Sequence, residues 1–166
     1  MKLDALRKVY VEQLKDMYSA ETQLLEAIPK MAEAATSEKL TQAFHDHLKE
    51  TQGQISRLET IFESLEYEPG GHRCKAMAGL IEEGEEIIKS DGEPEARDAA
   101  LICAAQKVEH YEIATYGSLR AYARVLGEDN AEKLLTETLD EERKADSLMT
   151  DLAENTINKL AMLAAN

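Results

Sequence analysis

The sequence predicts an all-α fold. We expect an antiparallel four-helix bundle in which a long connection, carrying a short extra helix, joins the second helix to the third. Ala, Leu, Glu and Lys dominate the 166 residues and aromatic residues contribute only 5%, so helix formers outweigh strand formers. Apolar residues recur at helical spacing in four long segments. The length suits one domain with one core, predicted to span residues 1–166.

The first two helices are predicted at about residues 3–35 and 38–65. Apolar residues recur in both at steps of three, four or seven, which is the helical period. Pro29 lies inside the first helix, and we expect it to kink the helix or to cause a local break, because proline removes an amide donor. Ser37, followed by an acidic residue, suits the start of the second helix. The apolar face expected for that helix consists of Leu40, Phe44, Leu48, Ile55, Leu58, Phe62 and Leu65.

The remaining helices follow the strongest chain breaker, Glu68-Pro69-Gly70-Gly71. A short helix is predicted at 75–89 and a third long helix at about 95–126, closed by Gly127. The fourth long helix is predicted at about 129–163. Tight links join the first helix to the second and the third to the fourth, so these pairs are expected to be antiparallel. A long middle connection of this kind is typical of ferritin-like bundles.

Net charge and composition exclude several classes of function. With 33 acidic and 19 basic residues the formal net charge is −14. Phosphate backbones and anionic membranes are therefore repelled, and we expect no nucleic acid and no membrane as partners. Cys74 and Cys103 lack CxxC spacing and are expected to be reduced thiols. Neither a signal peptide nor a membrane-spanning stretch is recognisable, so the expected compartment is the cytoplasm.

Acidic residues lie on helix faces that are otherwise apolar, at a similar height in the predicted bundle. A carboxylate buried without a partner costs several kcal/mol, and no Lys or Arg falls on these faces at the same level. A pair of metal ions, iron or manganese, is the natural counter-charge for clustered carboxylates. The acids are Glu21 on the first helix, Glu109 and Glu112 on the third, and Glu142 and Asp146 on the fourth, while the second helix offers His47, Thr51 and Gln54.

Simpler interpretations of these residues remain open. A Glu at the edge of an apolar face often keeps its carboxylate in water, and His47 is more often a hydrogen-bonded boundary residue than a ligand. Gln54 would then only hydrogen-bond the carboxylates. His110 is expected on the other side of its helix. Cys74 follows His72 and Arg73, which could lower the pKa of its thiol, but a structural thiol is the simpler interpretation.

Five segments of the sequence, which together span nearly the whole chain, resemble the YciF-like stress-protein family of the ferritin-like superfamily. The resemblance implies a four-helix ferritin-like fold, often dimeric, with a metal centre and no defined activity. The segments are YSAETQLLEAIPKM at 18–31, HLKETQGQISRLE at 47–59, CKAMAGLIEEGEE at 74–86, DAALICAAQKVEHYEIATYGSLRAYA at 98–123 and ETLDEERKADSL at 137–148.

The resemblance also implies a ligand set. Glu21 and Glu109 match ligand positions of ferritin-like di-metal proteins, with Glu112 one turn after Glu109. Glu142 matches the ligand of the last helix, although aligning DEERKAD with the bacterioferritin motif would choose Glu141 instead. The apolar face of the helix favours Glu142.

The chain departs from that pattern because neither half keeps Glu-x-x-His. The second helix offers Glu50-x-x-Gly53 or Thr51-x-x-Gln54, and the last helix offers Glu141-x-x-Lys144 or Glu142-x-x-Ala145. The loss of both imidazoles argues against ferroxidase, catalase or oxygenase activity. Gln54 and Asp146 are the nearest substitutes, so the predicted metal ligands are Glu21, Gln54, Glu109, Glu112, Glu142 and Asp146.

Two functional hypotheses follow. The first is a stress-associated ferritin-like homodimer with a non-haem iron or manganese di-metal site in the bundle core, facing a small oxidant such as peroxide or oxygen. The second is a non-enzymatic helical bundle that acts by dimerisation or by binding a partner, with a degenerate metal site. No phosphate-binding glycine loop, CxxC or Ser-His-Asp motif supports other chemistry, and the sequence leaves open whether the protein is an enzyme.

Overall fold

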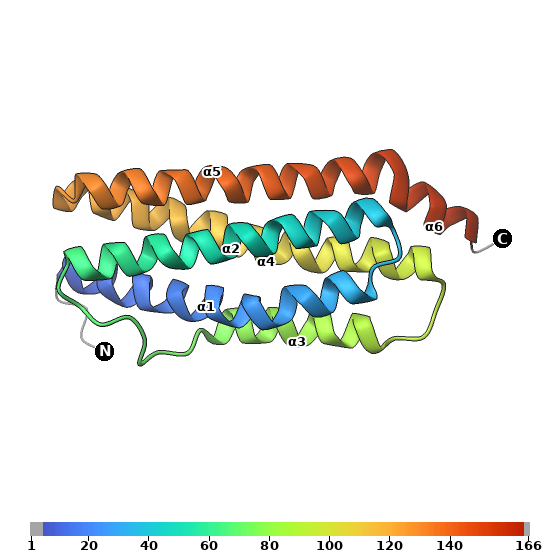
Figure 1. Cartoon of the computed structure of the whole chain (residues 1–166), viewed down its shortest axis with the longest axis horizontal. Coiled ribbons are helices and arrows are strands. Elements are labelled where there is room, and N and C mark those ends of the chain that lie inside the picture. Colours follow the sequence, from blue (N-terminus) through green and yellow to red (C-terminus); the bar gives the residue numbers. More distant parts are fainter. Residues whose placement is uncertain (1–4, 165–166) are drawn as a thin grey trace.

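The computed structural model describes residues 5–164, and every regular element in that range is helical (Figure 1). This confirms the all-α prediction. The elements are α1 (Leu6–Ala34), α2 (Glu38–Ser64), α3 (Lys75–Lys89), α4 (Pro94–Leu126), α5 (Asp129–Leu152), the π-helical turn η1 (Ala153–Ile157) and α6 (Asn158–Ala164).

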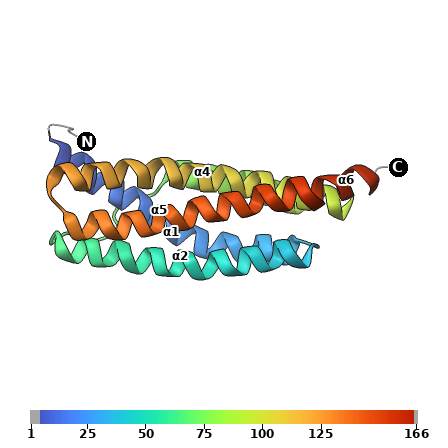
Figure 2. The ribbon, with the colours of Figure 1, turned by 90° about the horizontal axis from the view of Figure 1, so that it is seen from above.

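The four long helices form a bundle in which packed neighbours are antiparallel (Figures 1 and 2). α1 packs against α2, and α4 against α5; α1 also contacts α4, and α2 contacts α5. The long connection from α2 to α4 carries α3, which lies along the outside of α1 and α4 (Figure 1). None of the helices in residues 5–164 is both long and apolar enough to cross a bilayer.

Two helices differ from their predicted course. α1 continues through Pro29 as one helix, so of the two predicted alternatives, a kink or a local break, the break is wrong. Packing of α1 against three neighbouring helices stabilises it more than one missing hydrogen bond destabilises it. The last predicted helix is interrupted by η1, which separates α5 from α6. The wider turn buries Ile157, whereas α6 buries no residue.

A buried carboxylate on α4 fixes the start of α2. Asp98 is 2% exposed and accepts three hydrogen bonds of 2.8 Å, from Thr36 N, Thr36 Oγ1 and Ser37 N. Ser37 in turn caps α2. The amides before and at this helix start are thus paired by a carboxylate from another helix, which ties the α1–α2 hairpin to α4.

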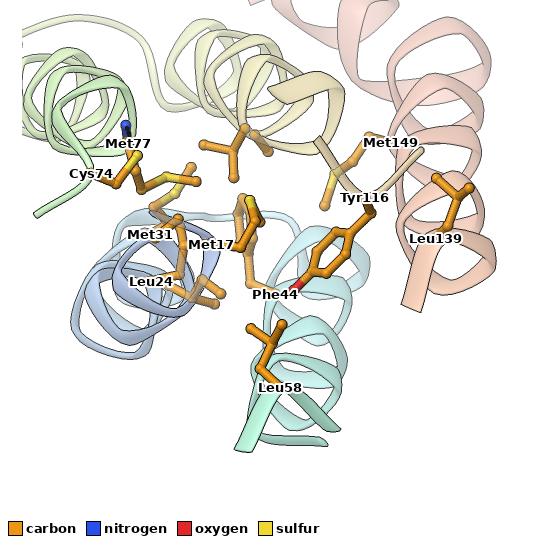
Figure 3. Close-up of a cluster of buried hydrophobic side chains, with 14 of the residues drawn as sticks. Met17, Leu24, Met31, Phe44, Leu58, Cys74, Met77, Tyr116, Leu139 and Met149 are labelled. Atoms are coloured by element: carbon orange, nitrogen blue, oxygen red, sulfur yellow. Dashed lines mark hydrogen bonds between the residues drawn. The ribbon is translucent and has the colours of Figure 1, made fainter. Parts of the chain in front are cut away.

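Apolar side chains from all the long helices and α3 converge in the core, with Tyr116 directed from α4 into the bundle (Figure 3). The buried face of α2 differs from the predicted one, because Leu48 and Ile55 are only half-buried whereas three polar residues are buried. The buried positions alternate in steps of four and three, as expected for a helix facing antiparallel neighbours. This run is Leu40, Phe44, His47, Thr51, Gln54, Leu58 and Ile61, and Ala43 and Phe62 beside it are also buried.

Candidate metal centre

Four ionisable side chains meet in the middle of the bundle. His47 of α2, Glu109 and Glu112 of α4, and Glu142 of α5 each offer a ligand atom, and these four atoms all lie within 4.8 Å of one another. The four residues are between 0% and 5% exposed. The structure therefore brings together three of the predicted carboxylates and adds an imidazole.

The α1 carboxylate completes the ring of helices around this cluster. Glu21 is fully buried and its Oε1 accepts a hydrogen bond from the Tyr116 hydroxyl. Tyr116 lies one turn after Glu112 on α4, so helical spacing places the phenol beside the cluster. Glu21 interacts electrostatically with Glu142. All four long helices thus contribute a polar side chain to one buried region.

Burial controls the electrostatics of the carboxylates. It raises the pKa of Glu21, Glu109 and Glu112 well above the ordinary range of a glutamate, and interactions with the neighbouring Glu142 raise each pKa further. For Glu21, the hydrogen bond from Tyr116 opposes the rise in pKa. Carboxylates in this environment either hold protons at neutral pH or require a cation.

The side-chain amide of Gln54 contacts two adjacent glutamates of α5, Glu141 and Glu142. Its Nε2 donates to Glu142 Oε1 and also, at 3.2 Å, to Glu141 Oε2. Glu141 turns away from the cluster and forms an ion pair with Arg57. Of the two alternatives for the α5 ligand, Glu142 is the one that enters the cluster, because adjacent residues on a helix point about 100° apart.

His47 is the residue that sequence reasoning undervalued. Its Nε2 lies 3.4 Å from Glu109 Oε1, and its Nδ1 lies 3.7 Å from Glu50 Oε2. The steps of three and four residues between Phe44, His47 and Thr51 could have indicated this position in the sequence, because they place the imidazole on the inner face of α2. The cluster therefore contains one imidazole, although no Glu-x-x-His motif supplies it.

Asp146 lies at the edge of the cluster and outside the four-residue group. Its side chain is 24% exposed, and its Oδ1 lies 3.1 Å from Gln106 Nε2 and 3.2 Å from His110 Nε2. Its charge contributes to the raised pKa of Glu109, so it lies near that carboxylate. His110 itself is 69% exposed.

Cys74 serves a structural role. Its Sγ lies 3.2 Å from Asp16 Oδ2 and 3.1 Å from the Tyr111 hydroxyl, and it accepts a hydrogen bond from Met77 N at the start of α3. Burial raises the pKa of the thiol, contrary to the alternative that the preceding His and Arg activate it. His72 is engaged by Asp16 at 2.7 Å instead.

The donor set fits a metal ion. Most buried side-chain atoms without a hydrogen-bond partner in residues 5–164 belong to this region. Carboxylate, imidazole and amide oxygen donors suit iron and manganese, and leaving such atoms unpaired in a core is costly. These atoms are Glu21 Oε2, His47 Nδ1 and Nε2, Gln54 Oε1, Glu109 Oε2, Glu112 Oε1 and Oε2, and Glu142 Oε2. Without a cation, the carboxyl groups can only share protons with one another.

Comparison with known proteins adds family information. Residues 5–162 match a family described as a domain of unknown function, DUF892. The chain is 52% identical to Protein YciF of Escherichia coli K12 over 162 residues, which cover 97% of this chain and 98% of that protein.

Solved structures agree in fold. The crystal structure of the E. coli stress protein YciF matches with a TM-score of 0.90, over 94% of this chain and 99% of that chain. YcfI of Rhodopseudomonas palustris is 41% identical, with a TM-score of 0.86 over 90% of this chain and 95% of its own. A Xanthomonas campestris protein shares the fold at 20% identity, with a TM-score of 0.79 over 98% of this chain and 100% of that chain.

Proposed function

This chain belongs to the DUF892 family and is a homologue of YciF, and on that premise we propose that it is a stress-associated protein that binds iron or manganese in its bundle core. The observation that carries the proposal is the group of unpaired, buried donor atoms contributed by all four long helices. An acidic cluster of this kind has no structural advantage over apolar packing unless a cation neutralises it.

The proposed ligands follow from burial and proximity. His47, Glu109, Glu112 and Glu142 form the centre of the site, and Glu21 adds a further carboxylate. Gln54 supplies an amide oxygen, and Asp146 would act from the edge. A bound iron or manganese ion would supply the capacity to bind and reduce a small oxidant such as peroxide or oxygen. The chain's own residues would hold the ion and exclude bulk water.

The scaffold belongs to the same proposal. We take residues 1–166 as one domain of ferritin-like architecture, which is supported by the long crossover between α2 and α4 and by carboxylates on facing helices. A homodimer in the cytoplasm is the proposed working state.

Metal content tests this proposal. Untagged protein, loaded anaerobically with Fe²⁺ or Mn²⁺ and then desalted, is expected to retain about one or two ions per chain. The double variant Glu21→Ala, Glu142→Ala is expected to retain almost none. A matched control, Glu26→Ala with Asp140→Ala, removes exposed acids from the same two helices and should retain the wild-type amount. Wild-type protein without metal, or a double variant that keeps it, would refute the proposal.

A further inference from the structure

The carboxylate cluster is closed to solvent. Glu21, Glu112 and Glu142 are fully buried and Glu109 is 1% exposed, so no ion reaches them unless a side chain moves. A small cavity of about 20 Å³ lies between α1, α3 and α4, but apart from Lys30 and Glu85 its lining is apolar. A hydrated cation would lose its water there without gaining ligands, so this cavity offers no route.

The seam between α2 and α5 is bridged by charged side chains. Arg57 donates through Nη1 and Nη2 to both oxygens of Glu141, at 2.7 and 2.5 Å, and through Nη1 to Thr138 Oγ1 at 3.1 Å. The side chains of Arg57 and Glu141 are each 22% exposed, and Glu137, farther out, is 48% exposed with its Oε2 3.7 Å from Arg57 Nε. This pair therefore lies between solvent and the cluster.

The seam connects to the cluster by hydrogen bonds. Gln54 Nε2 donates to Glu141 on the outer side and to Glu142 on the inner side. A polar path thus leads from exposed Glu137 through Glu141 to buried Glu142, with the guanidinium of Arg57 closing it. Bidentate arginine–carboxylate pairs are strong and directional, so they hold a defined closed arrangement.

The two other polar approaches are less complete. On the α4–α5 side, Asp146 binds Gln106 and His110, but no hydrogen bond to a cluster carboxylate is found there among residues 5–164. On the outer edge of α2, Glu50 lies 3.7 Å from His47, and the imidazole would have to leave its place to admit an ion.

We propose that the Arg57–Glu141 ion pair is the gate through which a divalent cation enters and leaves the buried cluster. This inference rests on the proposed metal site. Opening requires Arg57 to release Glu141 and turn away from the seam, so that a cation from solvent can reach the buried Glu142. Arg57 and Glu141 set the rate of exchange, whereas the buried ligands set the affinity.

Stopped-flow measurement of Co²⁺ binding, and of its release to EDTA, tests the gate. Arg57→Lys keeps the positive charge but loses the bidentate pair, so loading and release should both accelerate about tenfold, with little change in Kd. Glu141→Gln breaks the same pair from the other side and should also load faster. Electrostatic attraction alone would make it slower, because that variant loses a negative charge. His110→Ala and Glu50→Gln, on the other two approaches, should exchange at the wild-type rate.

The outcomes separate the gate from the site. If wild-type protein binds no Co²⁺ at equilibrium, the proposed metal site and its gate both fail. If wild-type protein binds Co²⁺ but Arg57→Lys and Glu141→Gln load no faster, or if a variant on another approach changes the rate, the gate is refuted and the metal site stands. Circular dichroism of each variant shows whether the bundle is retained.

Discussion

Replacing Glu112 with Gln is expected to stabilise the metal-free protein at pH 8 by about 1–3 kcal/mol. Glu112 is fully buried beside the carboxyl groups of Glu21 and Glu142, no amide, hydroxyl or cationic group of residues 5–164 donates to its oxygens, and burial and the charge of Glu142 raise its pKa. A neutral amide of the same shape removes the cost of a buried charge and can donate to a neighbouring carboxylate. Urea unfolding in EDTA measures the change in the free energy of unfolding.

The pH dependence of this effect has a definite sign. Below the ordinary glutamate value of 4.5, the folded and unfolded chains both hold the proton, and stability is unaffected. As the pH rises above that value, the unfolded carboxylate ionises first, so the unfolded state gains and the protein loses stability until the folded carboxylates ionise. Metal-free wild-type protein should therefore be more stable at pH 5 than at pH 8, and Glu112→Gln should reduce the difference.

An exposed acid provides the control for this comparison. Glu26→Gln alters a surface carboxylate of α1 and should change the free energy of unfolding by less than about 0.5 kcal/mol. A loss of stability in Glu112→Gln at pH 8, comparable to that of a core deletion, would show that the ionised carboxylate already has a stabilising partner in the metal-free protein.

Adding Mn²⁺ is expected to reverse the order of stability of the wild-type protein and Glu112→Gln, so that the wild-type protein becomes the more stable of the two. At a free concentration of one hundred times Kd, a ligand that binds only the folded state adds about 2.7 kcal/mol. For a chain of this size that raises the midpoint of thermal unfolding by roughly 5–10 °C. The shift should be smaller at pH 5, because protons compete with the metal for the same carboxylates.

The variants distinguish core binding from surface binding of Mn²⁺. Glu112→Gln, although more stable without metal, should lose most of the Mn²⁺-dependent shift. The Glu26→Gln control should keep all of it. An equal shift in the double variant Glu21→Ala, Glu142→Ala would place the stabilising ion on the acidic surface instead of in the core.

The sequence was informative where helical periodicity decides the structure. The bounds of α2, α3 and α4 agree with the predicted ranges to within one residue, because the breakers and caps between them are strong. Glu21, Glu109 and Glu112 were placed on inner faces by spacing alone, since a fixed rise and turn per residue determine which positions face the core.

Tertiary packing decided what the sequence left open. The predicted apolar face of α2 included Leu48 and Ile55, yet both are only half-buried. The rotation of the helix is fixed by its packing against α1 and α5. The apolar face of the last helix favoured Glu142 over Glu141, but the partner that holds Glu141 outside the cluster is Arg57, which lies 84 residues away in the chain. Local pattern contains no information about a partner at that separation.

Anomalous diffraction from crystals grown with Mn²⁺ tests the central claim most directly, because it locates the metal. We expect a peak in the bundle core, within coordination distance of carboxylate oxygens of Glu112 and Glu142 and near the imidazole of His47. Data collected above and below the manganese edge would identify the element. No peak in the core of fully loaded crystals, or peaks confined to surface acids, would contradict a metal-binding role for this cluster.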